Sequence, residues 1–455
     1  MPIFYLQFRV VPTTSNPSVN AVDGALASCW IDEDAATVAL AKARFYVRRF
    51  DWEILKVEKA PTEVTEDNFR DRDVGLQQYR QAEEKGLAIY FVAWATDGKT
   101  RSGPVTLARP DDFDLNLYLA DRKKLKQKGR CLHYQAGRRC SHAIDAHSIQ
   151  KNGALALIAD SGHVYAMSSN FDDVRRHRGA PSYTKQGIQK VSTFRGFCAE
   201  HDVQLFRPID TSPLIPTEQQ ALLYAYRSLC RETFVKENGL RLLEKQASVG
   251  GQQPAVVQLL DQVRRGTAFG LKNLLRHKAA YERCFESESY TEVKYVAFCS
   301  SQEPTLAFSG LFYPDFDFMG ERLQNLGDRA LKPHLVTFSF APLESGWAVL
   351  FAWHSDSSET CVPFMSSLAN RIHADTTALG DHLFRLVISC CENIAIAPRW
   401  WERLPEVARL AIQEAAGRMV DIFALPEPDY LTRGLEGIST WRFDGVISSS
   451  LRETT

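Results

Sequence analysis

The amino-acid sequence predicts a multidomain α+β protein. The chain has 455 residues, which is more than one hydrophobic core usually organises. Runs with the alternating pattern of strands and runs with helical spacing occupy separate stretches of the chain. One stretch, residues 121–210, contains 16 Lys and Arg against 8 Asp and Glu, a net charge of +8 in a chain whose total is −1. These observations predict three parts: residues 1–110, 120–212 and 213–455.

Residues 1–110 have the pattern of a small antiparallel α+β sandwich, in which two helices cover one sheet. Apolar and aromatic residues mark the expected strands, which are residues 4–11, 24–32, 52–60 and 87–95. Helical spacing marks residues 35–50 and 69–86, and the second helix is expected to end at Gly86. The carboxylates of this part fall at expected helix starts and on solvent faces, so we expect a scaffold or sensing role.

Residues 213–455 are expected to form a helical and α+β domain with its own core. Thr217 is placed as the N-cap of the first helix, and a second long helical pattern covers residues 254–285. Strand patterns follow at residues 291–300, 305–313, 334–343 and 346–354. Helical patterns return at residues 362–374, 377–393 and 404–423. This part or the first could present a surface to a protein partner, and the sequence does not define an oligomeric state.

Composition argues against several classes of protein. No apolar run approaches the length of a membrane span, so no membrane partner is expected. The first residues, MPIFYLQFRVVP, lack the basic and apolar regions of a signal peptide and have the pattern of a strand. The ten cysteines show no regular spacing, which favours reduced thiols. We therefore expect a cytoplasmic protein in which most of the cysteines fill the core.

Four residues of the middle part have the chemistry of a metal site. They form a C-x8-C pair and a C-x2-H pair, made by Cys131, Cys140, Cys198 and His201. Two pairs of soft ligands separated by a polar loop are what a tetrahedral Zn²⁺ site requires. His133 and His142 are alternative ligands, and a set made of His133, Cys140, Cys198 and His201 remains open.

Basic residues collect beside the expected metal ligands. Six of them precede Cys131, at Arg122, Lys123, Lys124, Lys126, Lys128 and Arg130. A basic segment in an otherwise balanced chain is the electrostatic signature of a contact with a phosphate backbone. We therefore expect nucleic acid as a partner, with DNA favoured.

The order of these features resembles the zinc-bearing HNH, or ββα-metal, domain of nucleases. The resemblance rests on the cysteine pair, a histidine in the strand-like segment IDAHSIQ, a long insert, and C-x2-H at the start of a helix. It implies that His147 is the general base that activates water and that Asp202 binds a catalytic Mg²⁺ or Mn²⁺. It also implies that Cys131, Cys140, Cys198 and His201 hold a structural Zn²⁺.

The sequence departs from the HNH pattern at two places. Ala146 precedes the expected base, where the family often has Asp or His, and Asp145 lies one residue further back. Ser192 and Thr193 stand near the position of the family's asparagine. The zinc ligands therefore match the family better than the expected active site does.

The whole-chain pattern also resembles bacterial multidomain proteins of the anti-phage defence type, in which HNH-like effectors are flanked by sensing or assembly domains. This resemblance implies an antiviral nuclease that cleaves the phosphodiester bonds of DNA. The alternative is a zinc module without catalysis, which binds nucleic acid or a protein and in which His147 is structural. Unrelated core thiols are a third interpretation of the cysteine pattern.

The segment APRWWERLP near the C-terminus combines aromatic and basic residues. Trp400 and Trp401 follow Arg399, and such a group can stack on nucleobases. Adjacent residues of a helix project about 100° apart, so at least one of the two indoles is expected to pack in the core.

Overall fold

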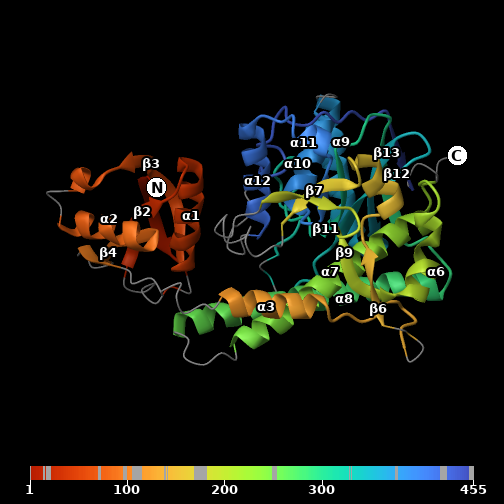
Figure 1. Cartoon of the computed structure of the whole chain (residues 1–455), viewed down its shortest axis with the longest axis horizontal. Coiled ribbons are helices and arrows are strands. Elements are labelled where there is room, and N and C mark those ends of the chain that lie inside the picture. The colour runs from red at the N-terminus through yellow and green to blue at the C-terminus, as the bar shows by residue number, and fades with distance from the viewer. Residues whose placement is uncertain are drawn as a thin grey trace. The chain divides into compact units, whose positions relative to one another are not determined.

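The chain folds into two compact units, one centred on Met1–Asp112 and one on Phe113–Val420, as a computed structural model shows (Figure 1). The described residues are 2–13, 16, 22–69, 73–95, 100–104, 115–137, 140, 142–168, 182–247, 254–326, 328, 330–374, 378–420 and 428–449. Both units combine helices with an antiparallel sheet, so the predicted α+β class is confirmed. The predicted division into three parts stays a prediction.

The first unit is built on a five-stranded antiparallel sheet with the order β3-β1-β2-β4-β5. Its strands are β1 (Ile3–Pro12), β2 (Val22–Asp32), β3 (Trp52–Val64), β4 (Leu87–Ala95) and β5 (Thr100–Pro104). Helix α1 (Ala36–Arg49) buries its apolar stripe against one set of alternating strand residues, and α2 (Asp73–Lys85) packs against the other set. Helix α2 ends at Gly86, which has a φ of 76°, as the sequence predicts.

The second unit contains an eight-stranded sheet with the order β15-β10-β13-β12-β11-β14-β7-β8. Its strands are β7 (His163–Met167), β8 (Tyr183–Gly187), β10 (Val293–Ser300), β11 (Leu306–Phe312), β12 (Val336–Pro342), β13 (Trp347–His354), β14 (Ile394–Ile396) and β15 (Gly445–Ser448). All residues of β13 are buried, because the strand lies inside the sheet with helices on both faces. Strands β7 and β8 come from the segment between the two expected zinc-ligand pairs, and β14 joins them to the rest of the sheet.

Helices cover both faces of this sheet. The long helices α7 (Glu218–Ala247) and α8 (Pro254–Glu286) share one core with Tyr295 and Leu350. Helices α9 (Ser358–Ala374), α10 (Leu379–Cys390) and α12 (Glu406–Val420) share the other core with Phe298 and Phe351. Thr217 is the N-cap of α7, as predicted, because its hydroxyl accepts a hydrogen bond from the backbone N–H of Gln220 at 3.2 Å. Among the described residues, no helix has the length and apolarity that crossing a bilayer requires.

A small two-stranded sheet and a helix form the part of the unit that carries the candidate site (Figure 1). Strand β6 (Ala143–His147) pairs in antiparallel fashion with β9 (Thr193–Cys198), and α6 (Ala199–Asp210) follows β9 directly. Helix α3 (Leu115–Lys126) precedes this part, and short helical turns at Lys151–Leu155 and Ala156–Ile158 (α4) follow β6. Helix α7 packs against both β9 and α6 and so supports the paired strands β6 and β9 from one side. The chain between β6 and β9 contributes β7 and β8 to the eight-stranded sheet, and the predicted HNH-like module stays a prediction.

Candidate metal centre

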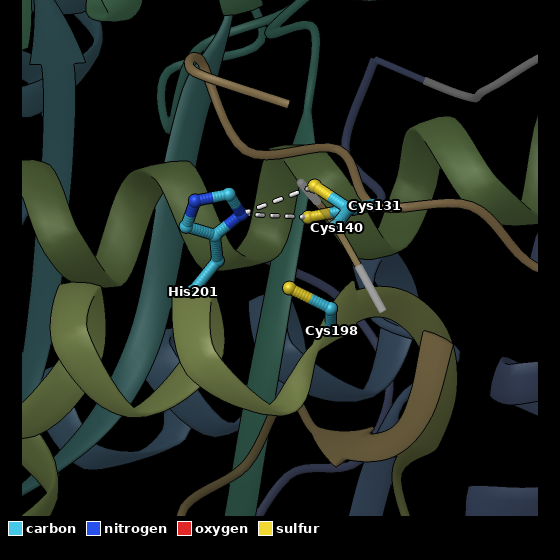
Figure 2. A group of neighbouring side chains, drawn as sticks. All are labelled: Cys131, Cys140, Cys198 and His201. Atoms are coloured by element: carbon cyan, nitrogen blue, oxygen red, sulfur yellow. Dashed lines mark hydrogen bonds between the residues drawn. The ribbon is translucent and has the colours of Figure 1, made fainter. Parts of the chain in front are cut away.

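The side chains of Cys131, Cys140, Cys198 and His201 converge on one point (Figure 2). The Nδ1 atom of His201 lies 3.4 Å from the Sγ atoms of both Cys131 and Cys140. All four candidate ligand atoms lie within 4.8 Å of one another. We refer to these four residues as the Cys3His cluster. It is the set that the sequence predicts.

Local backbone structure brings the four ligands together. Cys198 is the last residue of β9 and the N-cap of α6, and His201 lies on the first turn of that helix. The backbone N–H of Leu132 donates to the carbonyl of Gly196 at 2.7 Å and ties the Cys131 segment to β9. The hydroxyl of Tyr226 on α7 donates to the carbonyl of Leu132 at 2.9 Å. Cys198 at the end of β9 and His201 on the first turn of α6 therefore direct their side chains to the same point, which is what the C-x2-H spacing provides.

The geometry of the Cys3His cluster fits a zinc ion. Tetrahedral zinc with its usual bond lengths separates sulfur and nitrogen ligands by about 3.5 Å and two sulfurs by about 3.8 Å. The two measured sulfur–nitrogen distances of 3.4 Å agree with this geometry. Burial raises the pKa of the Cys131 thiol to about 11, so a cation is needed to hold that thiolate at neutral pH. Cys131, Cys140, Cys198 and His201 would thus hold a Zn²⁺ that cross-links the loop to the helix.

The structure decides between Cys131 and His133. Cys131 belongs to the cluster, whereas the Nδ1 atom of His133 accepts a hydrogen bond from the backbone N–H of Gln135 at 3.0 Å. The ring of His133 stacks on that of His201, with 4.1 Å between ring centroids and 7° between planes. His133 therefore packs on a member of the cluster and lies outside it. His142 is exposed and lies outside the cluster.

His147 lies at the end of β6, where it pairs with Thr193 of β9. Its Nε2 atom is 3.0 Å from the carbonyl oxygen of Ile188. Because a carbonyl only accepts hydrogen bonds, Nε2 carries the proton and Nδ1 is left with its lone pair. Burial lowers the pKa of His147 although the Ile188 carbonyl favours the charged form, so the imidazole is neutral at pH 7.

Asp202 lies on α6, immediately after the ligand His201. Burial raises the pKa of Asp202 to about 6, while nearby Arg227 opposes this shift and Asp210 adds to it. The same Arg227 and Asp210 act on the pKa of His147. The electrostatic environments of His147 and Asp202 are therefore connected through this pair of charges.

Sequence reasoning missed the Arg227–Asp210 pair. The guanidinium of Arg227 on α7 donates to both carboxylate oxygens of Asp210 on α6, at 2.8 and 2.6 Å. The Arg227 side chain is only 3% exposed and lies over the ring of Phe206 at 4.0 Å. These residues are 17 positions apart in segments that sequence alone does not align, so no local pattern indicates the pair.

Ser192 is one of the two residues that the sequence places near the expected position of the HNH asparagine. It has a φ of 62°, a left-handed conformation that is costly for a residue with a Cβ atom. Its hydroxyl accepts from the backbone N–H of Ile149 at 2.9 Å and bonds the hydroxyl of Ser148 at 2.8 Å. Ser192 therefore holds the two residues that follow His147. Asp145, two residues before His147, pairs with Arg195 at 2.9 Å.

The six basic residues before Cys131 occupy the end of α3 and the segment after it. Lys123, Lys124, Lys126 and Lys128 are exposed, and Arg122 is half-buried. Arg130 is exposed but pairs with Glu237 on α7 at 2.5 Å. The exposed cluster of lysines is thus compatible with a phosphate contact, whereas the charge of Arg130 is already compensated. Three basic residues of the long insert, Arg175, Arg176 and Arg178, lie outside the described residues.

Comparison with known proteins yields no relative. No family model matches the chain, and no curated protein or solved structure shows significant similarity to it.

Proposed function

We propose that the second unit is a zinc-stabilised, HNH-like nuclease that hydrolyses phosphodiester bonds of DNA. The observation that carries this proposal is the state of His147 on the ββα element. A general base needs an unprotonated nitrogen near neutral pH, held in a fixed direction. The Ile188 carbonyl supports both requirements, because it fixes the tautomer in which Nδ1 accepts a proton.

Asp202 supports the same proposal. A carboxylate that follows a structural zinc ligand on the first helical turn is held by the zinc centre as well as by the helix. With a pKa of about 6, Asp202 is largely ionised at neutral pH and can bind a divalent cation. In this role a Mg²⁺ or Mn²⁺ would stabilise the charge that develops on the phosphate.

Four groups of residues then have separate roles. The Cys3His cluster holds the fold of the loop and helix through Zn²⁺. His147 accepts the proton of the attacking water, and Asp202 holds the second cation. The exposed lysines at 123–128 position the phosphate backbone, since such contacts provide affinity without sequence preference.

Incubation of the full-length chain with plasmid, single-stranded DNA and RNA, in the presence of Mg²⁺ or Mn²⁺, tests the proposal. We expect cleavage that is lost in His147→Ala and reduced in Asp202→Asn, while the zinc content of both variants equals that of the wild type. General-base catalysis contributes about 10²–10⁴-fold, so the decrease in His147→Ala has to be at least of that order.

His163→Ala is the matched control. His163 is an exposed histidine of the same module, and its Nδ1 atom is 2.8 Å from the carbonyl oxygen of Ser161. We expect this variant to cleave like the wild type. Cleavage by His147→Ala at the wild-type rate would refute the assignment of the base.

One observation favours a second function, binding without catalysis. Among the described residues, the Cys3His cluster is the only group of three or more His, Cys, Asp or Glu side chains that could hold a metal, so Asp202 does not belong to a second cluster of that size. In that case the module recognises nucleic acid, and the zinc serves only the fold. Salt-dependent DNA binding by a chain that does not cleave any of the three substrates supports this alternative.

A further inference from the structure

A cavity of about 480 Å³ lies in the second unit and shares no residue with the Cys3His cluster or with strands β6 and β9. Its lining includes Gln302, Glu303, Thr305, Arg399, Trp400 and Arg403. Its volume falls within the range of about 300–1,000 Å³ that is usual for small-molecule sites. The lining combines two guanidinium groups, one carboxylate, one indole and several hydroxyl and amide groups.

The walls of the cavity are held in place by buried tryptophans. The indole N–H of Trp347 donates to the carbonyl of Gln302 at 3.0 Å, and that of Trp441 donates to the hydroxyl of Thr305 at 2.8 Å. The backbone N–H of Ala397 donates to the carbonyl of Thr305 at 2.9 Å and joins the two principal walls. The cavity is therefore formed by the fold itself and does not depend on a ligand.

The two arginines of the cavity have little compensating charge. Arg399 is 69% exposed and its nearest carboxylate oxygen, on Asp160, is 3.9 Å away. Arg403 is exposed and forms no ion pair with any described residue. The acid between them in sequence, Glu402, is occupied on another side, since it accepts from Tyr165 and Lys185, both at 3.2 Å. Two positive charges thus line one cavity without a strong protein partner.

The adjacent residues Trp400 and Trp401 differ in burial. Trp401 is 4% exposed and packs against Tyr165 and Tyr183 in the core. Trp400 is half-buried, contacts Phe384 at 5.8 Å between ring centroids, and lines the cavity. One indole therefore anchors the segment, and the other offers aromatic surface beside the two guanidinium groups.

We propose that this cavity binds a nucleoside monophosphate. Arg399 and Arg403 bind the phosphate, because guanidinium groups donate paired hydrogen bonds to phosphate oxygens. Trp400 contacts the base, since every base has a face that can stack on an aromatic ring. Glu303, which also lines the cavity, accepts hydrogen bonds from the ribose hydroxyls. The proposal does not rest on nuclease activity.

Isothermal titration calorimetry with the full-length, zinc-loaded chain tests this proposal, using AMP, adenosine and inorganic phosphate as probes. We expect AMP to bind at least tenfold more tightly than adenosine or phosphate. The double variant Arg399→Ala/Arg403→Ala is expected to weaken AMP binding at least tenfold and to leave adenosine binding unchanged. Trp400→Leu is expected to weaken both AMP and adenosine, by about tenfold, because it removes the stacking surface.

Two control variants locate the binding. Arg433 is 81% exposed and lies outside the cavity, so Arg433→Ala is expected to bind AMP like the wild type. His147→Ala is expected to do the same, which separates this cavity from the proposed catalytic site. The proposal is overturned if AMP gives no binding heat at millimolar concentration, or if the double arginine variant, shown to be folded by its melting temperature, binds AMP as tightly as the wild type.

Discussion

Removing the metal from the Cys3His cluster is expected to destabilise the second unit by an amount that can be worked out from the structure. The cluster joins Cys131 to His201 across 70 positions of the chain. A covalent cross-link of that loop length removes about 4 kcal/mol of conformational entropy from the unfolded chain. A metal present at 100 times its dissociation constant stabilises the folded state by about 2.7 kcal/mol.

These two figures bracket the expected effect on thermal stability. For a large domain, a change of 1 kcal/mol in the free energy of unfolding shifts the melting temperature by about 2 °C. We therefore expect chelation of the metal to lower the melting temperature of the second unit by about 5–8 °C. The same decrease is expected for Cys198→Ser, because this residue joins β9 to α6 and its replacement removes one of four ligands.

Differential scanning calorimetry before and after chelation measures this shift, and mass spectrometry of the metal content shows how much zinc each chain holds. Cys284→Ser is the matched control. Its thiol is 4% exposed and lies 3.7 Å from the carbonyl oxygen of Ala280, outside the cluster. This variant is expected to bind one zinc ion and to show the same decrease in melting temperature under chelation as the wild type.

The reasoning is refuted by either of two results. One is a purified chain that takes up no zinc even when zinc is added in excess. The other is a Cys198→Ser variant that binds one zinc ion per chain with wild-type affinity. A chain that holds zinc but melts at the same temperature after chelation would show that the cluster does not constrain the folded unit.

Three further predictions concern the same module. At pH 8, Asp202→Asn is expected to raise the free energy of unfolding by about 1–3 kcal/mol, and with it the melting temperature, because a carboxyl with a folded pKa near 6 costs stability once it ionises. The difference between the variant and the wild type shrinks as the pH falls from 6 to 4. A variant that melts like the wild type at pH 8 would contradict this prediction. Gly129→Ala is expected to weaken zinc binding in a competition titration, because the added Cβ atom would lie 2.0 Å from the carbonyl oxygen of Arg195, whereas Gly137→Ala, with nothing within 4 Å, is the neutral control. The affinity for DNA is expected to depend less steeply on salt once the exposed lysines at 123, 124 and 128 are neutralised. The slope of log affinity against log salt concentration is expected to fall by about 0.9 for each phosphate that the variant no longer neutralises. An unchanged slope would show that DNA binds elsewhere on the protein.

The elements that sequence predicts well are those with strong local patterns. Residues 87–95 form β4 with the predicted bounds, and α2 and α7 end or begin where Gly86 and Thr217 indicate. Short elements without a pattern of their own were missed. Strands β14 and β15 have three and four residues, and they become strands because β11 and β10 offer them backbone partners.

In the candidate site, too, some features could be predicted from the sequence and others depend on tertiary packing. The metal ligands could be predicted because Cys and His at suitable spacing have few other reasons to occur together. The sequence left His133 open as an alternative to Cys131, because the two residues are two positions apart; in the structure Cys131 belongs to the cluster and His133 stacks on His201. The Arg227–Asp210 pair and the left-handed Ser192 depend on tertiary packing, which leaves no local signal in the sequence.

The Cys3His cluster and His147 lie at opposite ends of the paired strands β6 and β9. Cys198 pairs with Ala143 at one end of the β6–β9 ladder, and Thr193 pairs with His147 at the other end. The ladder spans roughly 13 Å, and a two-stranded sheet of this size is marginally stable by itself. A zinc ion in the cluster would hold the register on which the direction of the His147 imidazole depends. It follows that a loss of cleavage after chelation would not by itself identify a catalytic metal, and the dependence on Mg²⁺ or Mn²⁺ has to be measured with the Cys3His cluster filled.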